Sequence, residues 1–221
     1  TGEIFESLSR KLYYDAYEHQ AAEMTRFAGR RLAEYLERAL FVCPQCESVG
    51  TLYSHRRRLR CLHCGYEVHY NPFGYLEPRS GRLYFSTVRD WNVWQIANFQ
   101  EQIDEWLEHY KQGGAGDTPF IRDTEAVLEI GYKTLPLKQF AKGDLELHPD
   151  ELRIIRPDGS QYAFTLSEME GINIQNNERM EFYYRDDLYK VTLSDPRGCT
   201  YKWDVALKYL QENPLRSIAV S

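Results

Sequence analysis

The cysteines between residues 43 and 64 constrain the fold of this chain more than any other feature. Cys43, Cys46, Cys61 and Cys64 follow the spacing C-x2-C-x14-C-x2-C. A two-residue gap lets both thiolates of a pair reach one ion, and the intervening stretch is long enough for a hairpin that brings the second pair opposite the first. Four thiolates satisfy a tetrahedral zinc ion and leave no coordination position open. The pattern therefore predicts a zinc ribbon with a structural, non-catalytic metal.

Other chemistries also fit these cysteines. Iron in a rubredoxin-like site is the main alternative, because tetrahedra of thiolates suit both metals. A disulfide framework is the default in secreted proteins, but the first residues here are polar and mixed in charge, unlike a secretory signal. The fifth cysteine, Cys199, has no cluster of basic residues next to it, so we expect a small, partly buried side chain and not a nucleophile.

Two details of the ribbon can also be predicted. The residue after each second cysteine often takes a left-handed backbone, which glycine adopts most easily. Gly65 fits this rule and Glu47 does not, so we expect the first pair to be less regular. Since four cysteines already complete the metal shell, the nearby histidines are expected at the surface or beside the ligands. These histidines are His55, His63 and His69.

An arginine cluster lies between the two cysteine pairs. It consists of Arg56, Arg57, Arg58 and Arg60. The simplest interpretation is a solvated hairpin tip. The alternatives are anion-binding roles: contact with nucleic-acid phosphates, or with anionic lipid headgroups, which contribute about 1 kcal/mol per basic residue. The chain carries a formal net charge of −6, which disfavours nucleic acid as the partner.

Helical periodicity dominates the first half of the chain outside the cysteine unit. Apolar residues recur at helical spacing in residues 29–40, and a separate helix is expected over residues 9–20. Apolar residues also recur every three or four positions between residues 84 and 112, and Thr87 with Asp90 fits a capping box. This second region predicts an amphipathic helix. Its tryptophans are interpreted as core residues, with an aromatic belt at a membrane surface as the alternative. They are Trp91, Trp94 and Trp106.

From about Thr124 onward, short alternating runs replace helical periodicity. The candidate strands, separated by polar turns, are residues 126–133, 139–148, 151–156, 161–166, 170–175, 179–185 and 188–194. A last amphipathic helix is expected near residue 200 and ends at Pro214. A small, strongly bent antiparallel sheet has an open end that such a helix can cover. This order of elements resembles that of pleckstrin-homology-like (PH-like) domains.

These elements predict an α+β protein in four parts. The parts are a helical segment that ends a preceding domain (residues 1–41), a zinc ribbon (42–80), an amphipathic helix (84–112) and a seven-stranded antiparallel PH-like barrel with a C-terminal helix (120–214). No run of about 18 apolar residues occurs, so no membrane span is expected. We expect a cytoplasmic location, peripheral at the inner face of the membrane.

Several stretches together resemble the region that follows the acyltransferase domain in many bacterial lysophospholipid acyltransferases of the 1-acylglycerol-3-phosphate type. They lie within about residues 10–110 and read LYYDAYEHQ, GRRLAEYLERALFVCPQCESVGTLYSH, CLHCGYEVHYNPFGYLE and FSTVRDWNVWQ. The family's catalysis uses a His-x4-Asp motif, in which the histidine takes the proton of the acceptor hydroxyl. This sequence contains no such motif, and no Gly-x-Ser-x-Gly, P-loop or dinucleotide fingerprint. The resemblance implies that the catalytic domain lies before Thr1 and that this chain alone is inactive.

The resemblance implies a non-catalytic structural or regulatory module with a structural zinc ion, linked to phospholipid biosynthesis. Its partners are then the preceding acyltransferase domain and either a protein or an anionic membrane surface. A nucleic-acid-binding zinc-ribbon protein, using the arginines at residues 56–60, is the alternative. A stand-alone scaffold for a protein partner is a third interpretation.

Overall fold

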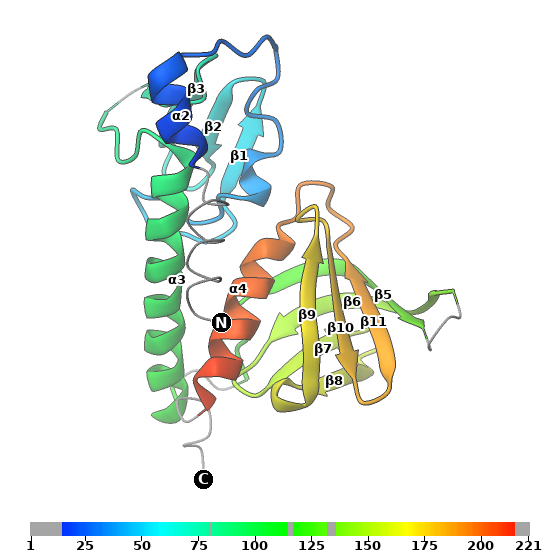
Figure 1. Cartoon of the computed structure of the whole chain (residues 1–221). Coiled ribbons are helices and arrows are strands. Elements are labelled where there is room, and N and C mark those ends of the chain that lie inside the picture. The colour runs from blue at the N-terminus through cyan, green and yellow to red at the C-terminus, as the bar shows by residue number, and fades with distance from the viewer. Residues whose placement is uncertain (1–14, 80, 115–116, 132–135, 215–221) are drawn as a thin grey trace, which may run out of the picture.

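The computed structural model describes residues 15–79, 81–114, 117–131 and 136–214. A four-stranded sheet forms one end of the molecule, a long helix runs down one side, and a seven-stranded sheet with a covering helix lies beside it (Figure 1). The chain therefore mixes helices with antiparallel sheets, as the sequence predicts. Among the described residues, no helix has both the length and the apolar character of a membrane-spanning segment.

The N-terminal region is less helical than predicted. Helix α2 covers Ala16–Glu23 and begins at Asp15, whose side chain accepts hydrogen bonds from two backbone N–H groups. The earlier part of the helix expected over residues 9–20 lies outside the described residues. The helix expected over residues 29–40 is wrong, because only a short 3-10 turn, η1 (Leu36–Arg38), forms there.

The physical reason is that the backbone of this segment bonds to the ribbon. The N–H of Ala33 donates to the carbonyl of Arg56 at 2.8 Å, and the N–H of Tyr35 donates to Ser54 Oγ at 2.8 Å. Tyr35 also has a φ of 64°, which interrupts helical geometry. The apolar spacing therefore serves tertiary packing and not a helix.

The cysteine region folds into the four-stranded antiparallel sheet. Its strands, in spatial order, are β1 (Leu52–His55), β2 (Arg58–Cys61), β3 (Glu67–Tyr70) and β4 (Leu76–Pro78). Strands β1 and β2 alternate buried and exposed residues, so one face packs inward and the other meets solvent. The buried face packs around Trp91 of the long helix, which has no exposed surface.

The long helix α3 (Val88–Lys111) forms where predicted, a few residues inside its expected start. Thr87 caps it by accepting a hydrogen bond from the Asp90 N–H at 3.0 Å. Its buried positions recur every fourth residue: Trp91, Gln95, Phe99, Ile103 and Leu107. All three tryptophans pack against the hydrophobic cores, which agrees with their interpretation as core residues.

The second half of the chain forms the predicted seven strands. They are β5 (Arg122–Gly131), β6 (Lys138–Leu147), β7 (Glu151–Ile155), β8 (Gln161–Thr165), β9 (Met169–Gln175), β10 (Arg179–Tyr184) and β11 (Asp187–Thr192), with a 3-10 turn, η2 (Leu166–Glu168), after β8. Every pairing is antiparallel, in the order β8-β7-β6-β5-β11-β10-β9. Helix α4 (Thr200–Glu212) lies against the sheet and buries Trp203 and Leu207 (Figure 1).

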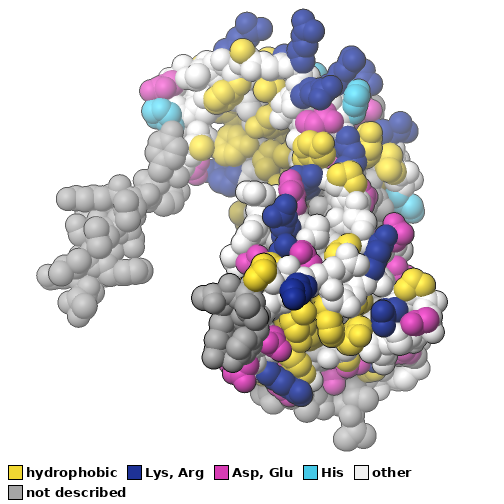
Figure 2. Space-filling model, turned by 90° about the vertical axis from the view of Figure 1, so that its right-hand side faces the viewer, with side chains coloured by type: hydrophobic (Ala, Val, Ile, Leu, Met, Phe, Trp, Pro, Cys, Tyr) yellow, Lys and Arg dark blue, Asp and Glu magenta, His cyan; other side chains and the backbone are white. Residues whose placement is uncertain are grey.

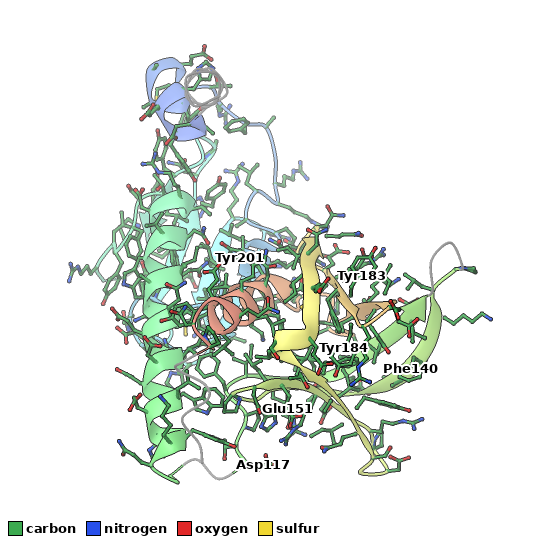
Figure 3. All side chains as sticks on the ribbon, turned by 60° about the horizontal axis from the view of Figure 1, so that its bottom comes forward. Asp117, Phe140, Glu151, Tyr183, Tyr184 and Tyr201 are labelled. Carbon is green, nitrogen blue, oxygen red and sulfur yellow. The ribbon has the colours of Figure 1, made fainter. Side chains whose placement is uncertain are left out.

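One hydrophobic core joins the residues that lead into the ribbon with α3 and the large sheet. The ring of Phe41, two residues before the first cysteine, packs edge-on against Phe99 of α3 at 5.0 Å and against Tyr201 of α4 at 5.7 Å. Tyr201 points from α4 toward α3 (Figure 3). The boundary predicted between residues 41 and 42 therefore falls inside a shared core, because Val42 belongs to the same cluster.

Candidate metal centre

The four predicted cysteines converge on one point. Their sulfur atoms all lie within 4.8 Å of one another, and two contacts join opposite halves of the motif: Cys43 with Cys64 and Cys46 with Cys61, both at 3.7 Å. Zinc–sulfur bonds of about 2.3 Å in a tetrahedron place the sulfurs about 3.8 Å apart. All four thiols are free of disulfides. The donor set and its spacing therefore fit one tetrahedral metal ion.

The two cysteine pairs have the same backbone geometry. The N–H of Glu47 donates to the Cys43 carbonyl at 2.9 Å, and the N–H of Gly65 donates to the Cys61 carbonyl at 3.0 Å. Both donors have left-handed backbones, with φ of 57° at Glu47 and 80° at Gly65. The expectation of a less regular first pair is therefore wrong. The N–H of Glu47 makes the same turn hydrogen bond as the N–H of Gly65. Because this bond stabilises the turn, Glu47 adopts the left-handed backbone although it is not a glycine.

Two polar side chains beside Cys46, those of Ser48 and His63, favour the ionised form of its thiol. Ser48 Oγ lies 3.5 Å from Cys46 Sγ and 3.1 Å from His63 Nδ1. Burial acts to raise the pKa of Cys46, but hydrogen bonds from Ser48 and His63 outweigh it and lower the pKa to about 6. Burial raises the pKa of Cys43. Cys46 therefore offers a thiolate near neutral pH. His63, which lies beside the ligands, and His55 are both exposed, as predicted.

Helix α3 is hydrogen-bonded to the segment that leads into the first cysteine pair. Gln95 Oε1 accepts hydrogen bonds from the N–H groups of Phe41 at 2.8 Å and Val42 at 3.3 Å, and its Nε2 donates to the Ala39 carbonyl at 2.7 Å. Gln95 is fully buried, so these bonds satisfy three backbone groups of the segment that would otherwise be buried without a partner. Sequence analysis missed this residue; its signal was a lone polar side chain in the apolar stripe, four residues after Trp91.

The geometry of the centre suits a structural role. Cys43 and Cys61 are buried and the other two cysteines are half-buried, and four sulfur ligands fill a tetrahedral shell. A substrate then has no coordination position to occupy. An ion held by the four sulfurs would join the two ends of the β1–β2 hairpin to each other and, through Val42, to the shared core.

The fifth cysteine lies outside this centre, as predicted. Cys199 is 5% exposed, and its Sγ donates to the Arg38 carbonyl at 3.0 Å. Burial raises the pKa of this thiol to about 11. A neutral, buried thiol is a poor nucleophile, so Cys199 is a packing residue between η1 and the start of α4.

The structure divides the predicted arginine cluster. Arg56, Arg57 and Arg58 line one cavity at the tip of the β1–β2 hairpin, whereas Arg60 does not line it. Arg57 is half-buried and donates to the Gly29 carbonyl at 2.6 Å, and the other three are exposed. Figure 2 shows Lys and Arg side chains gathered over the ribbon end of the molecule.

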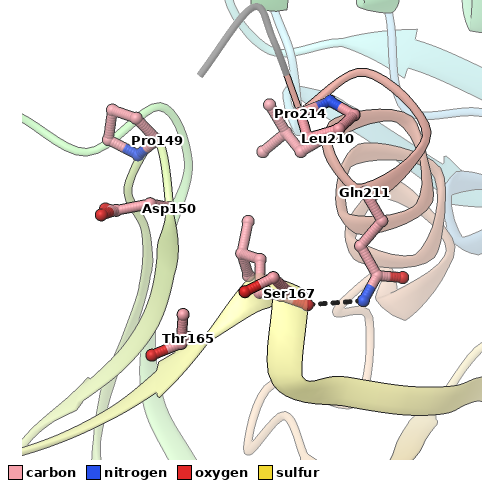
Figure 4. A pocket seen from close by; sticks show the side chains of 8 residues that line it. Pro149, Asp150, Thr165, Ser167, Leu210, Gln211 and Pro214 are labelled. Carbon is pink, nitrogen blue, oxygen red and sulfur yellow. Dashed lines mark hydrogen bonds between the residues drawn. The ribbon is translucent and has the colours of Figure 1, made fainter. Parts of the chain in front are cut away.

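A second cavity, of about 280 Å³, lies at the end of α4 beside η2 (Figure 4). Its lining is mostly apolar, and its main polar side chain is already bonded. Gln211 Nε2 donates to the carbonyls of Leu166 at 2.7 Å and Met169 at 2.8 Å. These bonds attach α4 to the sheet, so the side chain of Gln211 stabilises the fold.

Comparison with known proteins adds no family assignment: no protein-family model matches the chain, and no curated protein matches it significantly.

Proposed function

We propose that this chain is a non-catalytic structural or regulatory module that binds one structural zinc ion. It resembles the C-terminal region of a 1-acylglycerol-3-phosphate acyltransferase, so we place it in phospholipid biosynthesis. One observation carries the non-catalytic role: the four-cysteine centre is closed, lies in the ribbon core, and directly follows Val42 of the core that α3 shares with the seven-stranded sheet. A site built in this way stabilises a contact surface and leaves no room for substrate at the metal.

Zinc is the metal that we propose, with iron as the rival. Free thiols, sulfur separations of 3.7 Å and a thiolate-favouring environment at Cys46 support a tetrahedral divalent ion. Elemental analysis of the purified chain should give one zinc per chain and a colourless protein. A coloured protein that contains iron would assign the site to rubredoxin-like chemistry, and absence of both metals would remove the structural proposal.

We further propose that residues 120–214 form a PH-like barrel. The strand order supports this. Strands β5, β6, β7 and β8 are neighbours in sequence order, with β8 at one edge of the sheet. Strands β9, β10 and β11 continue from the other edge, and β11 pairs with β5. The terminal helix α4 then lies against β9, β10 and the η2 turn, where the two halves of the sheet diverge. This is the arrangement expected when a helix covers one end of a bent sheet.

The proposed partners are a preceding acyltransferase domain and a protein or anionic membrane surface. The test is to read the source gene upstream of Thr1, and to assay the chain alone and joined to that upstream segment. We expect a His-x4-Asp motif upstream, no acyl transfer by the chain alone, and transfer by the joined protein. Acyl transfer by this chain alone, or an unrelated upstream segment, would overturn the proposed parentage.

Nucleic-acid binding is the alternative function, and the exposed arginines of the hairpin, Arg56, Arg58 and Arg60, favour it. The formal net charge of −6 opposes it. Two assays separate these functions: flotation with anionic vesicles, and a gel shift with labelled DNA or RNA at several salt concentrations. Binding to nucleic acid that weakens steeply with salt would favour the alternative.

A further inference from the structure

The cavity at the tip of the β1–β2 hairpin has an unusual lining. It measures about 400 Å³ and is lined by arginines and histidines alone, with no acidic side chain. The arginines are Arg30, Arg56, Arg57, Arg58 and Arg79. Three of them belong to the hairpin, whereas Arg30 precedes the ribbon and Arg79 follows β4. The fold therefore gathers cationic groups from three separate stretches of the chain around one hollow.

The charge of this cavity is only partly neutralised. Glu67 is the carboxylate that reaches its arginines: Oε1 lies 3.0 Å from Arg79 Nε and 3.9 Å from Arg58 Nε. Two arginines thus share one carboxylate. In the described part of the chain, the side chains of Arg30 and Arg56 form no ion pair. Closely spaced cations with so few counter-charges repel one another, and a bound anion relieves that repulsion.

A row of donors across the sheet completes the cavity. Register places His55 opposite Arg58 and Arg58 opposite His69, so these three residues lie side by side on β1, β2 and β3. Both histidines line the cavity, and the Nδ1 atom of His69 is buried with no hydrogen-bond partner among the described residues. His55 and His69 therefore add imidazole groups to the guanidinium lining of the cavity.

We propose that this cavity binds a phosphate monoester. A monoester carries nearly two negative charges and three strong acceptor oxygens near neutral pH, and guanidinium groups bind such oxygens in pairs. The cavity volume exceeds the roughly 30 Å³ of one water molecule many times, so it accommodates a phosphate group with bridging waters. The ligand is either a soluble phosphorylated molecule or the headgroup of a membrane lipid. This inference deepens the proposed function and rests on it for treating the ribbon as a contact surface.

The same features disfavour nucleic acid at this site. Single strands bind to grooves that follow several phosphates and present aromatic platforms for the bases. Here the cationic lining surrounds one compact hollow and includes no Phe, Tyr or Trp. Two carboxylates flank it. Glu34 accepts a hydrogen bond from the Arg56 N–H, and Glu67 pairs with Arg79. An extended polyanion would meet these carboxylates, whereas a single phosphate group avoids them.

The test uses the whole chain and a variant with three arginines changed, Arg56→Gln/Arg58→Gln/Arg79→Gln. The matched control removes the same charge elsewhere: Arg60→Gln on the same hairpin, with Arg179→Gln and Arg185→Gln on β10 and its turn. Glycerol 3-phosphate titrated by calorimetry measures the soluble source. Flotation with phosphatidylcholine vesicles that contain phosphatidic acid measures the lipid source, and phosphatidylglycerol, a phosphate diester, replaces phosphatidic acid as the comparison.

We expect the unchanged chain and the control to bind glycerol 3-phosphate, phosphatidic acid vesicles, or both, and the cavity variant to bind about 100-fold more weakly. Which monoester binds identifies the source. Equal binding to phosphatidylglycerol, equal affinity of the two variants, or binding to nucleic acid alone would each overturn the proposal. Zinc content verifies folding of the variants. If the triple variant fails to fold, the exposed Arg30→Gln, which breaks no ion pair, should still weaken monoester binding.

This proposal and the proposed function can be contradicted independently. If the chain bound no phosphate monoester, the expected zinc content and the expected upstream catalytic domain would be unaffected. Conversely, a different parentage would leave the cavity and its anion chemistry intact.

Discussion

The indole Nε1 of Trp91 donates a 2.9 Å hydrogen bond to the carbonyl oxygen of Val42, the residue before the first metal-binding cysteine. Trp91 is fully buried, and it lies in the ribbon cluster whereas Val42 lies in the larger core. This contact therefore helps to connect the two cores at the edge of the candidate metal centre, where Trp94 also packs against both. Stability of the ribbon and stability of the sheet unit are linked through it.

Replacing Trp91 with Phe should destabilise the protein by about 1–3 kcal/mol, because the Val42 carbonyl loses its buried partner and the core loses volume. Urea unfolding followed by circular dichroism measures the change. Trp106→Phe is the matched control: its Nε1 is buried with no hydrogen-bond partner among the described residues, so removal of that donor should cost less. Equal destabilisation by both substitutions would show that the Trp91–Val42 bond contributes nothing specific.

Replacing Cys61 with Ser should release the metal and unfold the ribbon around residues 42–77. The reason is that Cys61 is buried between Cys46 and the hairpin, and closed zinc sites supply folding free energy directly. Metal content by elemental analysis and amide hydrogen exchange over the ribbon measure this. Cys199→Ser should keep the metal, since its sulfur bonds to the Arg38 carbonyl outside the centre. A Cys61→Ser protein with full metal content would contradict the four-ligand site.

The cysteine ligands and the strands could be predicted from sequence because their signals are local. Two-residue gaps between cysteines fix the geometry of each pair, and alternation of apolar residues fixes which face of a strand is buried. The conformation of residues 29–40 could not be predicted, because apolar spacing does not reveal the partners of the backbone hydrogen bonds. Its donors bond to Ser54 and Arg56 on the hairpin, a long-range arrangement that has no sequence signature.

The cavity on the ribbon shows the same limit. The arginines at residues 56–58 stand out in sequence as a cluster, but Arg30 and Arg79 join them only through the packing of the N-terminal segment and the β3–β4 pairing. Arg60, next in the cluster, does not line the cavity. Residues in a strand alternate between faces, yet membership of a cavity depends on which distant segments cover each end of the sheet.

Replacing Arg197 with Met should destabilise the protein by about 3–5 kcal/mol, because it leaves the carboxylate of Glu37 buried and unpaired. Arg197 Nη1 pairs with Glu37, which is 4% exposed, and donates to the Ser54 carbonyl at 2.8 Å. Its guanidinium also stacks over the Tyr53 ring at 4.2 Å. Urea unfolding measures the loss.

The control for that prediction is Arg185→Met, because Arg185 is 73% exposed and its pairing with Glu168 contributes at most about 1 kcal/mol. Changing Glu37 to Gln in the Arg197→Met protein should recover part of the lost stability, since the buried charge is then removed. If the single Arg197→Met substitution costs no more than the control, the contact between the ribbon and the β11–α4 loop is not held by this ion pair.

Stability should fall at alkaline pH in a way that depends on Cys199. Burial raises the pKa of this thiol from 9.0 to about 11, so the native state keeps a proton that the unfolded chain loses first. The contribution of this thiol to stability is complete below pH 9 and disappears as the pH rises through about 11, and its full size is about 3 kcal/mol.

Urea unfolding at several pH values should therefore show a steeper decline of stability with pH in the unchanged chain than in Cys199→Ser. Half-buried tyrosines, such as Tyr17 with its pKa raised to about 12, titrate in both proteins, so the difference between the two curves isolates the thiol. Parallel curves from pH 8 to 11 would show that Cys199 ionises as freely in the folded protein as in the unfolded chain.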